Sequence, residues 1–375
     1  MKKWILSAVT VIATLAAICI FISLVAAGTA VPLPTVPTEA SAPTAAPTAA
    51  PSTAPATTGA PTVPPTTVPP TTVPPTTVPP TTQAPTEVTE PPTEAPTEAP
   101  TEEPTEAPTE EYADAPYITA TSAFVYDSTG SELVYCLGDM GDQIYPASIT
   151  KLFTGYVALQ HLSEDTVVTG GEELYYVDPD SSLAYIAYGN QLTVDMLIEG
   201  MMLPSGNDAA YMLAAAAGRV IAGDPYLYPE FAVDEFVEEM NLQAAIHGMS
   251  GTHFSAPDGI HWDDHFTTME DLITVAELAL TESAIRTYGT DYASEVFFES
   301  GEYAYWVNTN KIVNPDSSYY HPSCIGLKTG HTSTAGYCLL SAFEIDGRTY
   351  IVGVFGCPGY DDRFSDTLTL IDHYT

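Results

Sequence analysis

Hydrophobic and polar positions divide the chain into three stretches. Residues 1–28 are predominantly apolar after Lys2 and Lys3, whereas residues 29–115 contain mainly Pro, Thr, Ala and Glu and have no apolar face. From residue 116 onward, strand-like alternation and helix-like periods appear. We therefore predict one folded domain over residues 116–375, preceded by a membrane-directed segment and a linker without a core.

The apolar run at the N-terminus covers residues 4–27 and contains no charge. As a helix it would measure about 36 Å, against a hydrocarbon core of about 30 Å. The apolar region of a cleaved signal is usually about 7–15 residues long. The length of the run at residues 4–27 and the two lysines before it favour a single-pass anchor with the N-terminus inside. Ala26, Ala27 and Gly28 keep a cleaved signal and a secreted domain as the alternative.

Repeats dominate the linker at residues 29–115. TTVPP occurs three times between residues 66 and 80, and PTEAP occurs twice between residues 92 and 100. Proline fixes φ and removes amide donors, so we predict a semi-rigid, polyproline-like spacer. Fully extended at about 3.1 Å per residue, it would reach roughly 270 Å. Such a spacer would hold the domain away from a membrane, and a passive disordered linker is the plainer alternative.

Strand-like alternation occurs at both ends of the domain, and helical periods lie between. The expected strands are 122–126, 132–136, 324–328, 337–343 and 350–355. The expected helices are 148–162, 193–202, 208–221, 234–247, 267–280 and 363–374. Thr267 and Glu270 have the spacing of a capping box.

This order predicts an α/β (α+β) fold of two lobes. An antiparallel sheet flanked by terminal helices would come from both ends of the domain, and an all-helical lobe would be inserted between them. A cleft between such lobes is a common place for an active site.

The domain is strongly acidic. Eleven of the chain's 48 Asp and Glu precede residue 116, which leaves 37 in the domain against seven Lys and Arg, a formal charge of −30. Such a surface repels DNA, RNA and anionic lipid, so we exclude nucleic acid as a partner. After residue 3 the lysines are Lys151, Lys311 and Lys328. Because lysine is so rare in this chain, each of these three is a candidate for a specific functional role.

Cysteines and histidines offer no convincing metal site. The domain contains Cys136, Cys324, Cys338 and Cys357 without zinc-ligand spacing. An exported protein could pair them, but we favour free thiols because Cys338 and Cys357 lie in or beside apolar strands. His261 and His265 invite comparison with a metal cluster, yet their Gly- and Asp-rich surroundings favour a solvated loop. We expect no metal and no cofactor.

Three other residues are assigned to packing or to the surface. His161 and His373 are expected at the surface. Trp306 is expected to be a core anchor rather than a platform for substrate.

Three short motifs follow one another along the domain. They are Ser148-Ile149-Thr150-Lys151 at the start of a helix, Ser205-Gly206-Asn207 between two helices, and Lys328-Thr329-Gly330 at a strand end. Each motif alone is weak. In this order, on these elements, and with two of the three domain lysines, they indicate a serine nucleophile site.

The first motif can build an activated serine. Ser148 and Lys151, three apart on a helix, lie within side-chain reach. A serine hydroxyl needs an adjacent base. Lys151 can be that base if burial or a nearby cation such as Lys328 destabilises its ammonium. Free backbone N–H groups at the helix start could hold an oxyanion.

The other two motifs suit substrate handling. A tight turn could direct Ser205 and Asn207 at one point, where they would pass a proton and hold an amide. Lys328 at a strand end, with Thr329 and Thr332, suits the binding of a carboxylate.

The surroundings of these motifs resemble the low-molecular-mass serine D-alanyl-D-alanine carboxypeptidases, a family of penicillin-binding proteins. The similar stretches are residues 203–210 (LPSGNDAA), 306–311 (WVNTNK), 326–332 (GLKTGHT) and 335–338 (AGYC). The resemblance runs from about residue 118 to the C-terminus.

The resemblance implies a mechanism. Ser148 would attack the carbonyl between the two terminal D-alanines of a peptidoglycan stem peptide, Lys151 would take its proton, and Ser205 would pass it to the leaving D-alanine. Backbone N–H groups of Ser148 and His331 would hold the oxyanion. β-Lactams would acylate the same serine. The residues assigned to substrate binding are Asn207, Lys328, Thr329, Gly330 and Thr332.

One loop departs from the family pattern. The stretch at residues 255–260 reads SAPDGI, where relatives usually have Asn or His before the glycine. Asp258 therefore puts the detail of this loop in doubt, without changing the chemistry.

Three other functions stay open. A class A β-lactamase would use a Glu to activate water, and Glu172-Glu173 invites that comparison but lacks the flanking pattern. A D,D-endopeptidase would share the site and differ in pocket shape. A non-catalytic wall-binding or β-lactam-sensing module would have lost a motif residue, and none is missing.

Overall fold

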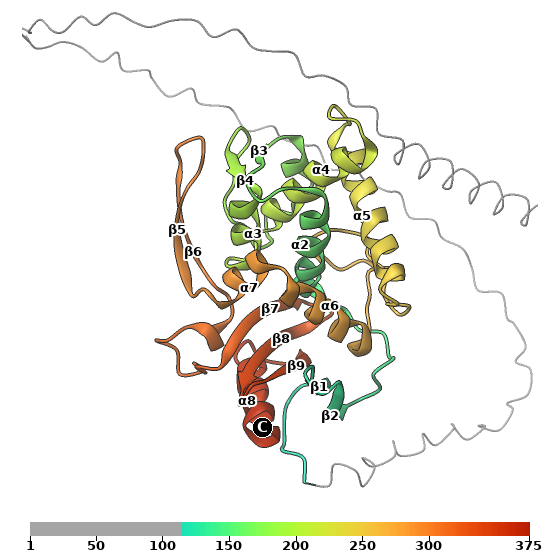
Figure 1. Cartoon of the computed structure of the whole chain (residues 1–375), viewed down its shortest axis with the longest axis vertical. Helices are drawn as coiled ribbons and strands as arrows, with labels where there is room; N and C mark the ends of the chain where they lie inside the picture. Colours follow the sequence, from blue (N-terminus) through green and yellow to red (C-terminus); the bar gives the residue numbers. More distant parts are fainter. Residues whose placement is uncertain (1–113) are drawn as a thin grey trace, which may run out of the picture. The chain divides into compact units, whose positions relative to one another are not determined.

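The computed structural model of the chain describes residues 114–375 (Figure 1). The predicted segment 1–28 and almost all of the predicted linker lie outside the described residues, so the anchor and the spacer stay predictions. Within residues 114–375, no helix combines the length and the apolar character needed to cross a bilayer.

Five antiparallel strands form the sheet of one lobe, in the order β2-β1-β9-β8-β7 (Figure 1). The strands are β1 Ser122–Asp127, β2 Glu132–Leu137, β7 Cys324–Thr332, β8 Gly336–Ile345 and β9 Arg348–Cys357. They come from both ends of the domain, as the sequence predicted. Strand β7 lies at the sheet edge, so one side of its backbone has no neighbouring strand.

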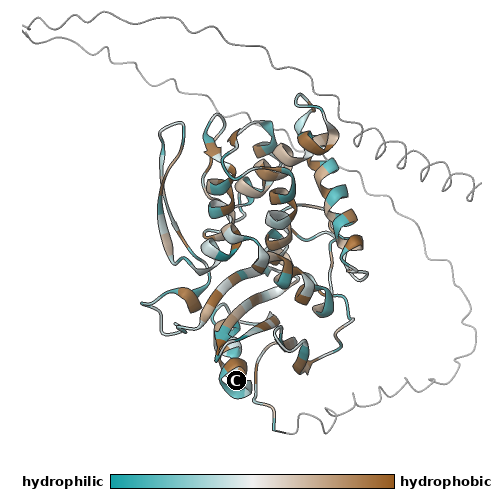
Figure 2. Cartoon of the chain, viewed as in Figure 1, coloured by the Kyte–Doolittle hydropathy of each residue, from teal (hydrophilic) through white to brown (hydrophobic). Residues whose placement is uncertain are grey.

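Alternating side chains of the sheet build two separate cores. Val352 and Val354 of β9 lie in a cluster with the C-terminal helix α8 (Asp362–Tyr374). Ile351 and Phe355 of the same strand belong to the other cluster, which continues into the helical lobe. The strands are accordingly coloured mainly as hydrophobic in Figure 2. The sheet therefore carries α8 on one face and the helical lobe on the other.

The helical lobe contains α2 Thr150–His161, α3 Val194–Met202, α4 Asn207–Ala222, α5 Pro229–Ile246, α6 Met269–Thr281 and α7 Ser283–Thr290. Local chemistry sets several of their ends. Thr193 caps α3 by accepting a hydrogen bond from Met196 N at 3.1 Å. Gly223, at φ 67°, ends α4 in the left-handed conformation.

Small elements complete the domain. They are the ribbons β3 Val167–Thr169 with β4 Gln191–Thr193 and β5 Ala293–Phe297 with β6 Tyr303–Val307, and the 3₁₀ turns η2 Ala147–Ile149, η3 Glu172–Tyr176 and η4 Lys311–Val313.

The predicted two-lobed architecture is confirmed, but several details were wrong. The capping box at Thr267 does not form, because Thr268 is the cap and accepts from Asp271 N. Helix α5 begins at Pro229, ahead of the predicted start at residue 234. Helix α7 and the β5–β6 ribbon were not predicted. The four domain cysteines are free thiols.

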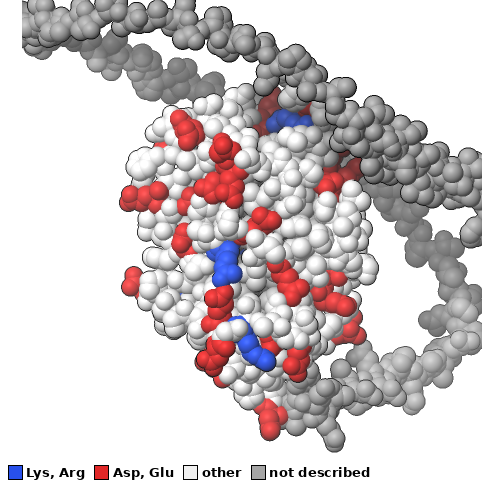
Figure 3. Space-filling view, in the orientation of Figure 1, with Lys and Arg blue, Asp and Glu red and all other residues white. Residues whose placement is uncertain are grey.

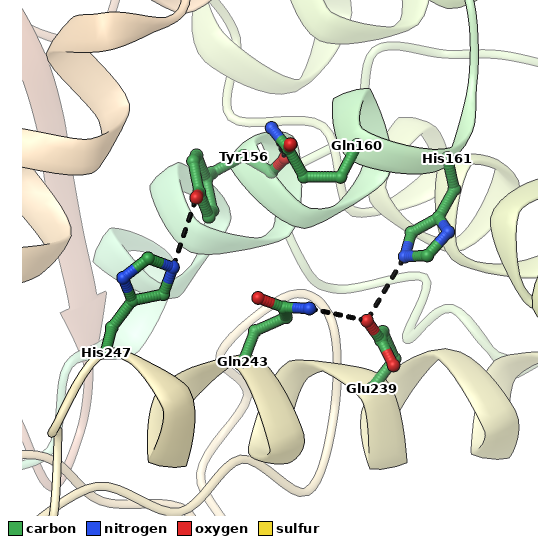
Figure 4. Close-up of polar contacts among 6 residues, drawn as sticks. All are labelled: Tyr156, Gln160, His161, Glu239, Gln243 and His247. Carbon is green, nitrogen blue, oxygen red and sulfur yellow. Dashed lines mark hydrogen bonds and ion pairs between the residues drawn. The ribbon is translucent and has the colours of Figure 1, made fainter. Parts of the chain in front are cut away.

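Polar contacts join α2, which begins inside the first motif, to α5 (Figure 4). His161 Nε2 lies 3.2 Å from Glu239 Oε1, which also accepts a bond from Gln243. At the C-terminal end of α5, Tyr156 Oη lies 3.1 Å from His247 Nε2. His161 is thus partly buried in a contact between helices rather than free at the surface.

Candidate active site

Ser148, the proposed nucleophile, lies on a tight turn. Two glycines from other parts of the chain, Gly259 and Gly330, pack against this turn. Ala147, just before Ser148, has φ 48°, which a residue with a Cβ rarely adopts. A Cβ on Gly259 would lie 1.9 Å from Ala147 O, and one on Gly330 would lie 2.8 Å from Pro146 O. Only glycine fits at Gly259, which also has φ 82°. The turn is therefore held between the 255–260 loop and β7.

Lys151 contacts the nucleophile directly. Its buried Nζ donates to Ser148 Oγ at 2.9 Å and to the backbone oxygen of Asp258 at 2.8 Å. Burial lowers the pKa of Lys151 to about 8, and the carboxylates of Asp258 and Asp208 oppose that shift. At neutral pH about a tenth of the lysine is then unprotonated, which a general base requires.

The second motif forms a strained turn between α3 and α4. Ser205 has φ 64° and is buried. Asn207 begins α4, and its Nδ2 donates to Asp258 Oδ2 at 2.8 Å. Asp208 accepts from the backbone N–H groups of Ala184 and of Ile186, both at 2.9 Å, which ties the turn to the preceding loop.

The third motif lies inside β7 rather than at its end. Lys328 is buried, and within residues 114–375 its Nζ makes one hydrogen bond, to Thr329 O at 3.3 Å. Burial, together with the positive charges of Lys151 and Arg363, lowers the pKa of Lys328 well below its usual value. Thr329 Oγ1 lies 2.6 Å from Thr309 Oγ1.

These elements surround a pocket of about 290 Å³. Its lining contains Ser148, Ser182, Ser205, Thr309, Thr329, Gly330, His331, Tyr337, Tyr360 and Arg363. Lys151, Asn207 and Lys328 are buried beside it. Thr332 lies elsewhere, in an adjoining cavity, and its Oγ1 accepts from Ala335 N at 3.0 Å. The structure thus brings together all the proposed site residues except Thr332.

Arg363 is a pocket residue that the sequence did not single out. Its guanidinium lies 4.6 Å from the ring centre of Tyr360, and its Nη1 donates to Gly330 O at 3.2 Å. Its buried Nε has no hydrogen-bond partner among the described residues. In the sequence, only the scarcity of basic residues could have drawn attention to Arg363. Its helix, α8, follows β9 in sequence and reaches the pocket only through the fold.

Asp258, which the sequence marked only as a departure from the family loop, contacts two of the motifs. It is buried, its Oδ2 accepts from Asn207, and its Oδ1 accepts from Ile260 N at 3.1 Å. Burial raises the pKa of Asp258, and the positive charge of Lys151 opposes that shift. The loop that departs from the family pattern therefore connects the first two motifs.

The weaker candidates lie outside the pocket. Glu173 is buried at η3, accepts from Gly171 N and lies 3.9 Å from Arg219. The prediction of a solvated loop at His265 was wrong. His265 is buried, and its Nε2 lies 2.9 Å from Thr150 Oγ1. Burial lowers the pKa of His265 to about 4. No cluster able to hold a metal occurs within residues 114–375. Trp306 is buried and donates to Ala184 O, as a core residue does.

Comparison with known proteins identifies the family. A family model described as D-alanyl-D-alanine carboxypeptidase matches residues 109–359, about two thirds of the chain. The chain belongs to the D-alanyl-D-alanine carboxypeptidase family. Membership makes it a serine peptidase of the penicillin-binding class, and the predicted family and enzyme class are confirmed.

Relatives cover much of the same region. A D-alanyl-D-alanine carboxypeptidase of Streptomyces sp. (strain K15) is 33% identical over 235 residues, which are 60% of this chain and 77% of the relative. The D-alanyl-D-alanine carboxypeptidase DacF of Bacillus subtilis is 24% identical over 257 residues, 68% of this chain and 61% of the relative.

Solved structures agree with the fold. The Streptomyces K15 DD-transpeptidase superposes with a TM-score of 0.63 at 29% identity, over 69% of this chain and 98% of that one. Penicillin-binding protein D2 of Listeria monocytogenes, in its cefotaxime-bound form, gives a TM-score of 0.57 at 26% identity, over 68% and 97% of the two chains.

Proposed function

We propose that the domain is a serine D,D-carboxypeptidase that removes the terminal D-alanine from peptidoglycan stem peptides through an acyl-enzyme on Ser148. The observation that carries this proposal is the 2.9 Å hydrogen bond between Ser148 Oγ and the buried Nζ of Lys151. A lysine whose pKa is lowered to about 8 can accept a proton near neutral pH.

Acylation follows from this contact. Unprotonated Lys151 takes the proton of Ser148 as Oγ bonds to the carbonyl carbon of the penultimate D-alanine. The resulting oxyanion would lie against the backbone N–H groups of Ser148 and His331. When the intermediate collapses, the C–N bond breaks and the leaving nitrogen receives a proton through Ser205. The shortened peptide stays on Ser148 as an ester.

The cationic end of the pocket suits the substrate's terminal carboxylate. Lys328, Thr329 and Arg363 lie together on this side. A carboxylate there would supply the counter-charge that these cations lack and the acceptor that Arg363 Nε lacks.

Water completes the cycle. It adds to the ester carbonyl, Ser148 regains its proton, and the shortened peptide leaves. A β-lactam would acylate the same serine, and without fast hydrolysis the adduct would persist. The site of Glu173, away from the pocket lining, argues against the class A β-lactamase mechanism.

The acyl group could also pass to an amine. The Streptomyces relative of known structure is called a DD-transpeptidase, so transfer to an amino group is the second candidate reaction of this site. Cleavage of crosslinked peptides is the third, because it differs only in the shape of the leaving group.

The location of this activity is part of the proposal. The apolar segment at residues 4–27 would anchor the chain, and residues 29–115 would act as a stalk that places the domain in the cell wall. A cleaved signal would release the same domain.

The first test is acylation of the full chain, in detergent, by benzylpenicillin, followed by intact mass and compared with Ser148→Ala. We expect a persistent adduct on the native chain alone, and release of D-alanine from a pentapeptide. Adding an amine acceptor or a crosslinked dimer separates transfer and endopeptidase activity from hydrolysis. A native chain that neither forms an adduct nor releases D-alanine would be a binding module instead.

A further inference from the structure

A second and larger cavity adjoins the active-site pocket. It measures about 530 Å³ and shares His331 and Tyr337 with that pocket. It lies where β7 ends, β8 begins and β9 ends, and the segment before the nucleophile turn forms its other wall. We call it the strand-end groove, and the residues used here are Gln143, Tyr145, Thr332, Ser333, Thr334 and Tyr337.

The direction of the substrate follows from the order of residues on β7. The proposed carboxylate site at Lys328 and Thr329 comes first, the proposed oxyanion N–H at His331 follows, and Thr332 ends the strand. A peptide added along this free edge must leave the pocket past Thr332. Each residue spans at most about 3.6 Å, so the residue before the two D-alanines reaches the strand-end groove.

The groove is polar but uncharged. Its lining includes no Lys, Arg, Asp or Glu. The hydroxyls of Ser333 and Thr334 and the amide of Gln143 make no hydrogen bond within residues 114–375, whereas Thr332 Oγ1 accepts from Ala335 N and holds the turn in place. The groove therefore presents free hydroxyl and amide groups on a fixed frame.

No basic side chain of the domain is available to it. Lys311, Arg348, Arg286 and Arg219 are paired with acids elsewhere. Lys151, Lys328 and Arg363 belong to the active-site pocket. Arg363 also lies 5.4 Å from the ring centre of Tyr337, which lines both spaces, but the proposed function assigns its charge to the terminal carboxylate of the substrate. Acidic side chains predominate on the face shown in Figure 3, and exposed Asp142 directly precedes Gln143. A carboxylate in this groove would find no basic side chain that is not already engaged by an acid or by the substrate's terminal carboxylate, in a domain of formal charge −30.

We propose that the strand-end groove binds the third residue of the stem peptide and selects a side chain without a free carboxylate, such as lysine or an amidated diamino acid. The inference rests on the proposed function and adds the class of stem that the site accepts. An ammonium group would meet hydroxyl and amide acceptors there and the favourable field of the acidic domain.

The test measures D-alanine release by the full chain from three pentapeptides. They carry L-lysine, amidated diaminopimelate or free diaminopimelate at position three. We expect kcat/KM to be about tenfold or more lower for the free diaminopimelate peptide than for the other two. Equal values for all three would overturn the selection.

A charge placed in the groove sharpens the test. Thr334→Lys and, independently, Ser333→Lys should raise kcat/KM for the free diaminopimelate peptide about tenfold relative to kcat/KM for the amidated peptide. Thr287→Lys, an exposed site on α7, has the same change in charge and should have no such effect. If Thr287→Lys raised it equally, overall charge and not the groove would be responsible, and the assignment would fail.

Benzylpenicillin acylation separates the two proposals. The native chain should be acylated whatever its preference at position three, because the reaction needs only the pocket around Ser148. Normal acylation with no dependence on position three leaves the proposed function standing and overturns the groove. No acylation and no D-alanine release would overturn both.

Discussion

The two faces of the central sheet differ in the polar groups they bury. Under α8 the core is apolar, and the buried carboxylate of Asp366 accepts bonds from Thr119 N, Thr119 Oγ1 and Ala120 N. At the boundary with the helical lobe, Lys151 and Lys328 are buried, and in the described part of the chain Lys328 makes a single hydrogen bond, at 3.3 Å.

The difference between the two faces shows where this fold buries groups that lower its stability. A buried charge without full hydrogen bonding destabilises the folded state. Lys151 and Lys328 are such groups, and they lie where a lowered lysine pKa serves the proposed reaction. One face of the sheet is therefore built for stability and the other for chemistry, and changes on the two faces should have separable effects.

The largest effect is expected from Lys151→Met. Removal of the base should slow benzylpenicillin acylation by about 10³-fold or more in a chain that still unfolds cooperatively in urea. Rates come from intact mass and stability from urea unfolding. Arg286→Met, at an exposed ion pair, is the control and should acylate normally. A native rate in Lys151→Met would remove this lysine from the mechanism.

Leu370→Ala tests the opposite face. Leu370 is fully buried in the cluster under α8, so its truncation should lower the free energy of unfolding by about 3 kcal/mol. The acylation rate of the remaining folded protein should stay unchanged. Leu368→Ala, at a partly exposed neighbour on the same helix, should cost less. Loss of acylation in folded Leu370→Ala would show that the two faces are coupled.

Asp258→Asn should have the smallest effect, a shift in pH dependence. Acylation of the native chain should rise with pH through about 8, since Lys151 must lose its proton and its pKa is about 8. Asp258 favours the charged lysine, so removing the carboxylate lowers the lysine pKa further and moves the rising limb to lower pH, by up to about one unit. An unmoved limb would mean that Asp258 is uncharged in this range.

The sequence predicted the architecture because its patterns were local. Alternation in the strands and the helical period around Lys151 depend on neighbours a few residues away. The elements that were missed are short: α7 and the β5–β6 ribbon form against the rest of the fold, with Trp306 buried on the ribbon's inner side. The predicted cap was Thr267 and the observed cap is Thr268, because both threonines satisfy the same local pattern.

The three motifs, their order, the family and the acidity of the domain could all be predicted from the sequence, since each is a property of residue identity and spacing. Only the tertiary structure decided that Asp258 joins Lys151 to Asn207, that Arg363 enters the pocket from α8, and that Thr332 belongs to a second groove. The physical reason is the same in each case. Burial, hydrogen-bond partners and pKa values depend on which distant segments meet in space.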